Sequence, residues 1–497
     1  MVLTGCAGAT PSVASRPVRL LRATLAGAIA SLLLSAVASA AKLSYTHPQP
    51  LPGSPPKGEA QGGEPSAVFD QGGRYLYVAA PGGSGPGGDF WRSTGAGRPG
   101  TFSKPIQVGS STGGGDEDLA VGYDKRHTVY QIDLEDLVAS DLCISVNHGR
   151  SFQPDCMSGA PAQQTDGAAD RPWITTVKGK PNLLYDTYDG LAFGGGAPEV
   201  QVSNDRGMSF TPCGQVLQPG SDAFAHFSST GAAENSEVIG KPAVDDEGTL
   251  YVPFTEPHRK GQIGDPDPTP SNLYLGIARG GCGGPLSTFT NKTLFQNDRG
   301  AGSNFVSIFP NVAADTHGDV YVLGAGRLRA GQKGQGVYLF VSRDRGRHFS
   351  APIKVNEGIQ AAQLAWVAAG KGRGEALVGW YGSTASPNPN SNKGRWRYRV
   401  AETFDYGHTF LRHRLTRQPT HYGNICNLGV LCGEGQDRTL LDFTTVAVNP
   451  RTGCGFAVFG ADPYNRKDPG AKPSAAYTSV QNGGPCLTAK NAGRHFR

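Results

Sequence analysis

Residues 203–210 read Ser-Asn-Asp-Arg-Gly-Met-Ser-Phe, and the outline of this octapeptide returns along the chain. A second copy, Ser-Arg-Asp-Arg-Gly-Arg-His-Phe, stands at 342–349, and both fit the pattern S/T-x-D-x-G-x-x-F. Looser copies occupy 145–152 and 403–410, and degenerate copies end at Phe102, at Phe289 and at residue 484. One motif that recurs over nearly the whole chain predicts a repeat architecture.

The motif has the chemistry of a tight hairpin turn. Its Asp carboxylate can accept backbone N–H groups, its Gly can adopt a backbone angle that other residues avoid, and its final aromatic can pack between neighbouring units. We therefore interpret Asp205 and Asp344 as structural residues and place no catalysis on them.

Short strands surround each copy of the motif. A Gly turn followed by a strand rich in Val and Tyr recurs, as in residues 246–252, and the alternation of apolar residues indicates β-strands. Seven such second strands can be counted, near Tyr77, Val129, Leu184, Tyr251, Tyr321, Val378 and Ala457. Four-stranded antiparallel sheets stacked about one axis form a β-propeller. The sequence thus predicts an all-β protein with one propeller of seven blades, or six if the first or last unit is not a blade.

The motif resembles the Asp-box, or BNR repeat, of sialidases and related β-propeller proteins. Residues 170–174, Asp-Arg-Pro-Trp-Ile, also resemble a segment of bacterial BNR-repeat proteins that are labelled sialidase-like. The resemblance implies the blade architecture, an exported bacterial protein and a carbohydrate or glycoconjugate ligand. Enzymatic sialidases have six blades, so a count of seven departs from that pattern.

Residues 1–40 have the pattern of a signal peptide. Three arginines precede an apolar run at 25–37, and Ala38-Ser39-Ala40 then offers a cleavage site. The run is shorter than the ~20 residues of a membrane-spanning helix, and no later stretch comes closer, so we expect no membrane span. The mature chain is expected to be secreted, periplasmic or at the cell surface, with a Pro- and Gly-rich arm at 41–64 and the propeller at 65–490.

Eight cysteines remain after cleavage near Ala40, and an even number in an exported chain favours disulfides. The predicted pairings are Cys143 with Cys156, Cys426 with Cys432, Cys454 with Cys486, and Cys213 with Cys282. None of the spacings is a paired C-x-x-C, so a zinc site is not predicted.

Net charge and missing motifs exclude several functions. The formal charge of +5 becomes 5 − 3 = +2 once the three signal arginines leave, which argues against a nucleic-acid partner. The sequence has no Gly-rich phosphate loop, G-x-S-x-G turn or H-E-x-x-H motif, and we predict no cofactor and no metal. Aspartates at 265 and 267, or at 315 and 319, could hold calcium, but ordinary turns explain them equally well. The oligomeric state stays open.

The site is expected on one face of the propeller. In an up-and-down blade, the loop after the second strand and the connection to the next blade share a face, and the long loops of this sequence fall there. The residues proposed for the site are Asp170, Arg171, Glu237, Asp437, Arg438 and Asp442. The two Asp-Arg steps rank highest, because they offer carboxylates and guanidinium groups at equivalent positions.

The resemblance implies a glycoside hydrolase of the exo-α-sialidase type. Such an enzyme needs an arginine cluster for the substrate carboxylate, a Tyr nucleophile activated by Glu, and an Asp acid. The F/Y-R-I-P segment that precedes the repeats of sialidases is absent. Other glycoside hydrolases need only two carboxylates at a suitable separation. We therefore predict that the protein binds carbohydrate and leave open whether it also hydrolyses it as a glycoside hydrolase, with a non-catalytic glycan- or protein-binding propeller as the alternative.

Residues 395–399, Arg-Trp-Arg-Tyr-Arg, form a second charged feature. On a strand they would place three arginines on one side and two aromatics on the other. The arginine side could take an acidic ligand, and the alternative is a solvated strand face.

Overall fold

The computed structural model describes residues 42–496, apart from 56, 59–60, 83–86, 110–114, 136–138, 154–168, 191–196, 226–238, 256–271, 283–287, 297–303, 306–308, 330, 427–431 and 433–434. The predicted signal peptide, Glu237, Cys156, Asp265 and Asp267 lie outside the described residues. None of the described helices is long and apolar enough to cross a membrane.

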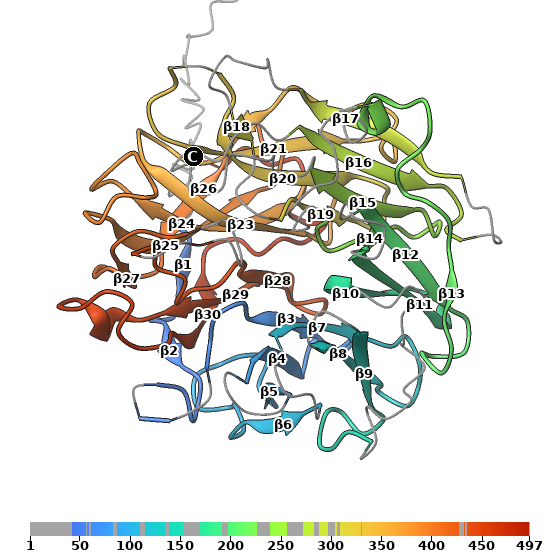
Figure 1. Ribbon diagram of the computed structural model, residues 1–497, viewed down its shortest axis with the longest axis horizontal. Coiled ribbons are helices and arrows are strands. Elements are labelled where there is room, and N and C mark those ends of the chain that lie inside the picture. The colour runs from blue at the N-terminus through green and yellow to red at the C-terminus, as the bar shows by residue number, and fades with distance from the viewer. Residues whose placement is uncertain are drawn as a thin grey trace, which may run out of the picture. The chain divides into compact units, whose positions relative to one another are not determined.

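Seven small antiparallel sheets follow one another along the chain and surround a central axis (Figure 1). Blade 1 consists of β3 (Ser66–Phe69), β4 (Leu76–Pro81), β5 (Gly88–Ser93) and β6 (Ile106–Val108). Blade 2 has β7 (Gly115–Val121), β8 (Val129–Glu135) and β9 (Ala139–Ser145). Blade 3 has β10 (Ala169–Val177), β11 (Lys180–Gly190), β12 (Ala197–Ser203) and β13 (Thr211–Pro212). Blade 4 has β14 (Ala243–Val244), β15 (Leu250–Thr255), β16 (Leu273–Ala278) and β17 (Thr290–Phe295).

The remaining blades carry additional short strands. Blade 5 has β18 (Asn304–Phe305), β19 (Asn311–Ala314), β20 (Val320–Arg327), β21 (Gly336–Ser342) and β22 (Ile353–Lys354). Blade 6 has β23 (Ala361–Ala369), β24 (Ala376–Ser383), β25 (Arg395–Thr403), β26 (Leu411–Arg414) and β27 (His421–Tyr422). Blade 7 has β28 (Thr445–Val448), β29 (Gly455–Ala461) and β30 (Ala475–Gly483). The predicted seven-bladed β-propeller is confirmed, and every predicted second strand is the second strand of a blade.

The N-terminal arm completes the last blade. β1 (Ser44–Tyr45) and β2 (Gln49–Pro50) both pair with β30, so blade 7 is built from the two ends of the chain. The Tyr45 hydroxyl also donates to Glu402 Oε1 of blade 6 at 2.9 Å. The ring of blades is thus closed by pairing between segments that are far apart in the sequence.

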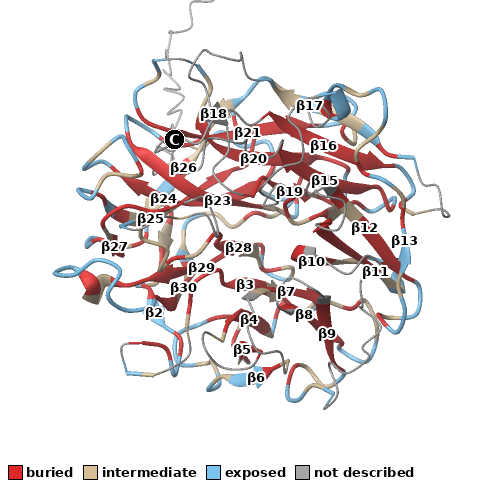
Figure 2. Ribbon diagram, viewed as in Figure 1, coloured by how far each residue is buried: buried red, intermediate tan, exposed pale blue. Residues whose placement is uncertain are grey.

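The core lies between the blades. The central strands β4, β15, β16, β21, β24 and β29 are buried at every position, because both faces of each pack against a neighbouring blade. Figure 2 shows this as buried strands surrounded by exposed loops at the rim. Strands with two covered faces are continuous apolar runs and not alternating ones, and the Val and Tyr content of the second strands is the part of the sequence signal that fits this burial.

The repeated octapeptide forms the same turn in four blades, with Asn147 in place of the Asp in the copy at 145–152. At 203–210 the Ser203 hydroxyl accepts the Gly207 N–H at 2.7 Å, and Asp205 Oδ1 accepts the Ser209 N–H at 2.9 Å. The copies at 342–349 and 403–410 repeat both hydrogen bonds. The residue before the Gly is left-handed as well, with φ of +70° at Arg206. The carboxylates of these aspartates are therefore already hydrogen-bonded within their own turns.

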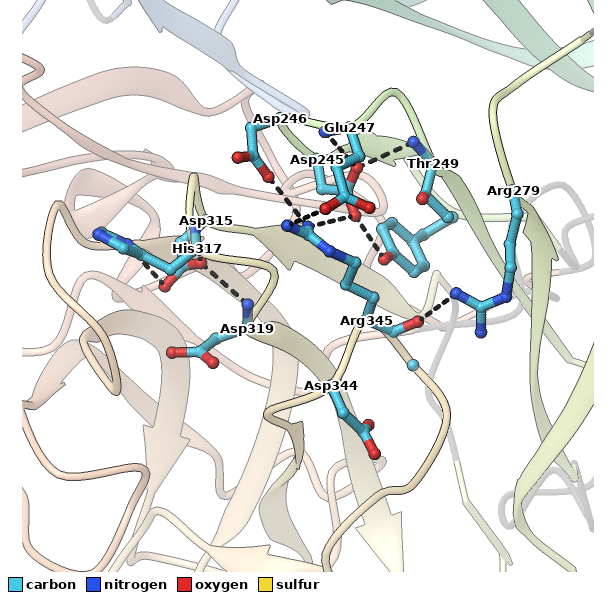
Figure 3. A network of polar contacts seen from close by, with 12 residues as sticks. Asp245, Asp246, Glu247, Thr249, Arg279, Asp315, His317, Asp319, Asp344 and Arg345 are labelled. Atoms are coloured by element: carbon cyan, nitrogen blue, oxygen red, sulfur yellow. Dashed lines mark hydrogen bonds and ion pairs between the residues drawn. The ribbon is translucent and has the colours of Figure 1, made fainter.

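One of these turns also joins two blades (Figure 3). Arg345 of blade 5 reaches the β14–β15 turn of blade 4, where it contacts Asp245 at 3.1 Å, Asp246 at 2.9 Å and Glu247 at 2.8 Å. Arg279 donates to the Arg345 carbonyl at 3.2 Å. The turn thus connects blades 4 and 5 through ion pairs and a hydrogen bond.

Disulfides occur at the predicted positions. Cys213–Cys282, Cys426–Cys432 and Cys454–Cys486 are bonded. Cys143 is also disulfide-bonded, and its predicted partner lies outside the described residues.

Candidate functional site at the loop-face end of the central channel

The propeller has two faces, which we define by the direction of the innermost strands. We call the face where these strands begin the loop face, and the face where they end, which carries the octapeptide turns, the turn face. On the turn face the channel opens as a cavity of about 720 Å³. Its walls are the innermost strands themselves, with apolar residues such as Leu119, Ile174 and Val446 between charged residues such as Lys178 and Lys371.

An aromatic cluster closes the channel toward the loop face. Trp173 lies with its ring centroid 4.9 Å from that of Phe443, 5.5 Å from Phe309 and 5.7 Å from Trp366. Trp173 and Trp366 belong to the innermost strands β10 and β23, and Phe309 and Phe443 belong to the connections before β19 and β28. Their contacts are edge-to-face or tilted, the arrangement that aromatic pairs prefer. Trp366 is buried at this position.

Arg171 lies on this aromatic floor at the loop face. Its guanidinium carbon is 4.5 Å from the Phe309 ring centroid. It contacts three carboxylates, at 2.6 Å to Glu64 Oε1, 2.7 Å to Asp116 Oδ1 and 3.0 Å to Asp442 Oδ2. We call these four residues and Arg438, which pairs with the same Asp442 oxygen, the Arg171 cluster.

The backbone of β10 is bent to present Arg171. The strand register shifts between Asp170 and Trp173, and Arg171 has a φ of +57°, which is uncommon for a residue with a side chain. Such a bulge turns a side chain away from the regular alternation of a strand. Here it places Arg171 over the channel while Trp173 points into the floor.

Three carboxyl groups share two guanidinium groups in the Arg171 cluster. Burial raises the pKa of Asp442 to about 6, although Arg438 and Arg171 act in the opposite direction. Burial also holds the pKa of Asp116 well above its usual range. For Glu64, Arg171 and Arg438 outweigh burial and lower the pKa. The cluster therefore combines an ionised carboxylate with carboxyl groups that keep a proton at mildly acidic pH.

The members of the cluster differ in exposure. The side chains of Arg171, Glu64 and Asp442 are at most 2% exposed, whereas that of Arg438 is 27% exposed. Arg438 is therefore the most exposed side chain of the cluster, followed by Asp116 at 12%.

The structure brings most of the predicted site residues together. Arg171, Arg438 and Asp442 meet through the Asp442 carboxylate. Asp170 is buried next to Arg171 in β10, and its charge contributes to the raised pKa of Asp116. Glu237 lies outside the described residues.

Asp437 lies in a different environment. Its Oδ1 accepts the Thr439 hydroxyl at 2.7 Å, and its Oδ2 lies 3.8 Å from His421 Nε2. His421 in turn contacts Asp462 Oδ1 at 2.8 Å through Nδ1 and the Asn424 carbonyl at 2.8 Å through Nε2.

His421, Asp437 and Asp462 are close enough to one another to hold a metal ion. Burial would lower the pKa of His421, but the hydrogen bond to Asp462 and the charges of Asp462 and Asp437 raise it. With both ring nitrogens facing oxygen acceptors, the imidazole fits a cation paired with carboxylates better than a metal ligand. Asp315, one of the predicted calcium candidates, accepts the His317 and Asp319 N–H groups of its own turn.

Sequence reasoning missed two members of the cluster. Glu64 belongs to the predicted arm, and Asp116 lies in β7. Glu64 stands two residues before β3, and Asp442 stands three residues before β28. An acidic residue shortly before the first strand of a blade was the sequence signal that could have identified Glu64.

Asp118 has a structural role. It accepts the Ile174 N–H at 2.9 Å and pairs with Lys241 at 2.7 Å, and its carboxylate also accepts the Ser66 hydroxyl at 2.7 Å. It therefore joins four blades at the channel wall.

No protein-family model and no curated protein sequence matches this chain. Similar solved structures include a protein of unknown function from Dyadobacter fermentans, 12% identical over 88% of this chain and 99% of that one, with a TM-score of 0.45. A lectin from Burkholderia pseudomallei is 8% identical over 86% and 98% of the chains, with a TM-score of 0.48. An α-L-arabinanase from Penicillium chrysogenum, complexed with arabinobiose, is 15% identical over 76% and 99%, with a TM-score of 0.41.

Proposed function

We propose that this protein binds carbohydrate at the loop-face end of its central channel, as an exported propeller from which residues 1–40 have been removed. The Arg171 cluster carries the proposal. It concentrates donors and acceptors from several blades over an aromatic floor, with Arg438 open to solvent. Sugar hydroxyls can both donate to carboxylates and accept from guanidinium groups, and a few convergent polar groups on an apolar base are typical of a ligand site.

Glycoside hydrolysis is a second function of the same site, and the different charge states of Asp442 and Glu64 favour it. The pKa of Asp442 is raised to about 6, while that of Glu64 is lowered. Glycosidases use one protonated carboxyl and one ionised carboxylate. In this proposal water attacks the anomeric carbon and the glycosidic C–O bond breaks. The Asp442 proton goes to the leaving oxygen, and the Glu64 carboxylate accepts a proton from the water.

The sialidase-like substrate class rests on the repeated motif and on the arginines. A sialidase clamps the substrate carboxylate with several arginines. Arg171 already contacts three carboxylates, so Arg438 is the guanidinium of the cluster with an exposed surface to offer. An α-sialoside therefore belongs in the substrate panel beside neutral glycosides.

Binding is tested on a glycan array with the mature protein, Arg438→Gln and the control Arg373→Gln. Arg373 pairs with Asp319 on the turn face and is half exposed, so its removal costs one charge without touching the channel mouth. We expect the wild type and the control to bind the same glycans and Arg438→Gln to lose them. Unchanged binding by Arg438→Gln would refute the loop-face site, and an empty array would refute carbohydrate as the ligand.

Hydrolysis is tested by release of 4-methylumbelliferone from its α-sialoside and from other glycosides. We expect Asp442→Asn to lower turnover by about 100-fold or more while glycan binding persists, because the general acid is lost. Turnover that Asp442→Asn leaves unchanged would contradict the acid role. If no substrate is turned over, hydrolysis is refuted and the alternative function, a non-catalytic binding propeller, remains.

A further inference from the structure

An arginine row runs along blade 6 on the side away from the aromatic core. In β25, Trp396 and Tyr398 are fully buried, while Arg395 is exposed and Arg397 and Arg399 are partly exposed. The alternation predicted for this strand is therefore present. Arg414 of β26 stands directly opposite Arg399 in the antiparallel pair. We call Arg395, Arg397, Arg399 and Arg414 the arginine ladder.

The ladder lacks the carboxylates that compensate other arginines of this protein. Arg171, Arg345 and Arg373 each contact at least one Asp or Glu. No ion pair of a ladder arginine occurs within the described part of the chain. Arg397 donates only to backbone carbonyls, at 2.9 Å to Arg417 and 3.5 Å to Arg395.

The ladder is electrostatically unfavourable as it stands. Like charges directly opposite each other on antiparallel strands are destabilising. Burial lowers the pKa of Arg399, and the neighbouring charges of Arg414 and Arg397 lower it further. Arg399 Nε is also buried without a hydrogen-bond partner. A row of mutually repelling, under-bonded guanidinium groups is a surface that an anion would stabilise.

A cavity extends the ladder toward the loop face. It has a volume of about 490 Å³ and is lined by Lys393, Arg395, Tyr422 and Arg466, among others. These residues come from the β24–β25 loop, β25, β27 and the segment that follows the helix η2 (Pro463–Asn465). The positive surface thus continues from the outer half of blade 6 into a cavity that is also lined by Arg466 of blade 7.

We infer that the arginine ladder and this cavity bind a linear anionic polysaccharide that carries sulfate or carboxylate groups. Alternate residues of a strand place charges about 6.7 Å apart in a line, which suits an extended polyanion better than a small anion. Guanidinium groups form bidentate contacts with carboxylates and with tetrahedral oxyanions. The inference rests on the proposed function only for the choice of a glycan, because the surface is separate from the Arg171 cluster.

Nucleic acid fits this surface less well. Single-stranded nucleic acid is bound through aromatic side chains on which its bases stack. The two aromatics of the strand, Trp396 and Tyr398, are fully buried on its opposite side. The arginine row therefore offers charge without a stacking platform of its own, and Tyr422 is the aromatic side chain that lines the adjoining cavity.

The test measures binding of the full mature protein to immobilised dextran sulfate, polygalacturonate and unsubstituted dextran. The ladder variant is Arg397→Gln/Arg399→Gln. The control is Arg343→Gln/Arg347→Gln, which removes the same charge from the octapeptide turn at 342–349. We expect binding to at least one anionic polymer and none to dextran. We expect the ladder variant to lose roughly tenfold in affinity or more, and the control to lose less than about twofold.

Further measurements keep the outcomes distinct. The ladder variant should melt at the same temperature as the wild type or higher, because the repulsion between the arginines is relieved. A lower melting temperature would mean that the arginines stabilise the fold and would contradict the inference. Equal losses in both double variants, or no binding to either anionic polymer, would overturn the inference. Arg438→Gln should leave dextran sulfate binding intact, and its loss there would move the anion to the Arg171 cluster. Binding of an oligothymidylate as tight as that of dextran sulfate would replace the glycan by nucleic acid.

Discussion

Arg171 and Arg345 each contact three carboxylates, but the two arginines lie on opposite faces of the propeller. Arg345 lies on the turn face with its side chain 18% exposed, and its partners Asp246 and Glu247 are exposed. Arg171 lies at the loop face and is 2% exposed, over an aromatic floor. Water and salt can screen the first group of charges but scarcely reach the second. The three ion pairs of Arg345 therefore connect two blades, whereas the three ion pairs of Arg171 lie in a buried cluster whose carboxyl groups have shifted pKa values.

The largest effect is expected from removing the buried guanidinium. Arg171→Met leaves Glu64, Asp116 and Asp442 with only Arg438 as a cation, and should lower the free energy of unfolding by about 3–5 kcal/mol at neutral pH. Denaturant unfolding measures the loss. The loss should shrink near pH 4, where the carboxyl groups can take up protons. A loss below about 1 kcal/mol would mean that the cluster is not a buried charge network.

A smaller effect is expected in the pH dependence of stability. The pKa of Asp442 is raised to about 6 in the folded protein, so between pH 4 and about 6 the folded state binds more protons than the unfolded state. Its contribution to stability is therefore present at low pH and is lost as the pH rises through 6, by an amount on the order of 2 kcal/mol. Asp442→Asn should reduce this slope by the share of Asp442 in unfolding experiments over that range, and the share of the other buried carboxyl groups with raised pKa values, such as Asp89 and Asp315, should remain.

Asp344→Asn is the matched control from the turn face. Hydrogen bonds with His348 and Ser342 lower the pKa of Asp344 to about 2. Its contribution is present above pH 4 and is lost as the pH falls toward 2, so this variant should differ from the wild type in the opposite direction and in a lower window. A slope between pH 4 and 6 that is as steep in Asp442→Asn as in the wild type would contradict the assignment.

The smallest effect is expected at Arg345. Arg345→Met should lower the free energy of unfolding by about 1 kcal/mol or less, because ion pairs near the surface contribute little. The difference from the wild type should become smaller in 1 M NaCl, whereas the effect of Arg171→Met should change little. Equal salt dependence of the two variants would remove the distinction between the faces.

The fold could be predicted because its signals are local. The turn at 203–210 contains its own hydrogen-bond partners, and the second strands are apolar enough to be read one blade at a time. The pairing of β1 with β30 could not be predicted, because a two-residue strand has no alternation to detect.

The candidate site was predictable only in part. Arg171, Arg438 and Asp442 stood out as charged residues before innermost strands. Their contacts with Glu64 span 107 residues from Arg171 and 378 from Asp442, and no sequence period encodes such distances. Asp437 and Arg438 are adjacent in an irregular connection, where nothing in the pattern indicates that one side chain turns to His421 and the other to Asp442.

The closure of blade 7 has a kinetic consequence. Ser44 and its hydrogen-bond partner Asn482 are 438 residues apart, so the last sheet cannot be completed until the whole chain is available. The entropy cost of joining such remote segments grows only slowly with their separation, but contacts of this range slow folding. β1 is available first and β30 last, and until the two strands pair, β30 has an unpaired edge that can pair with another chain. The time that this pairing takes therefore determines how long the protein is exposed to misassembly.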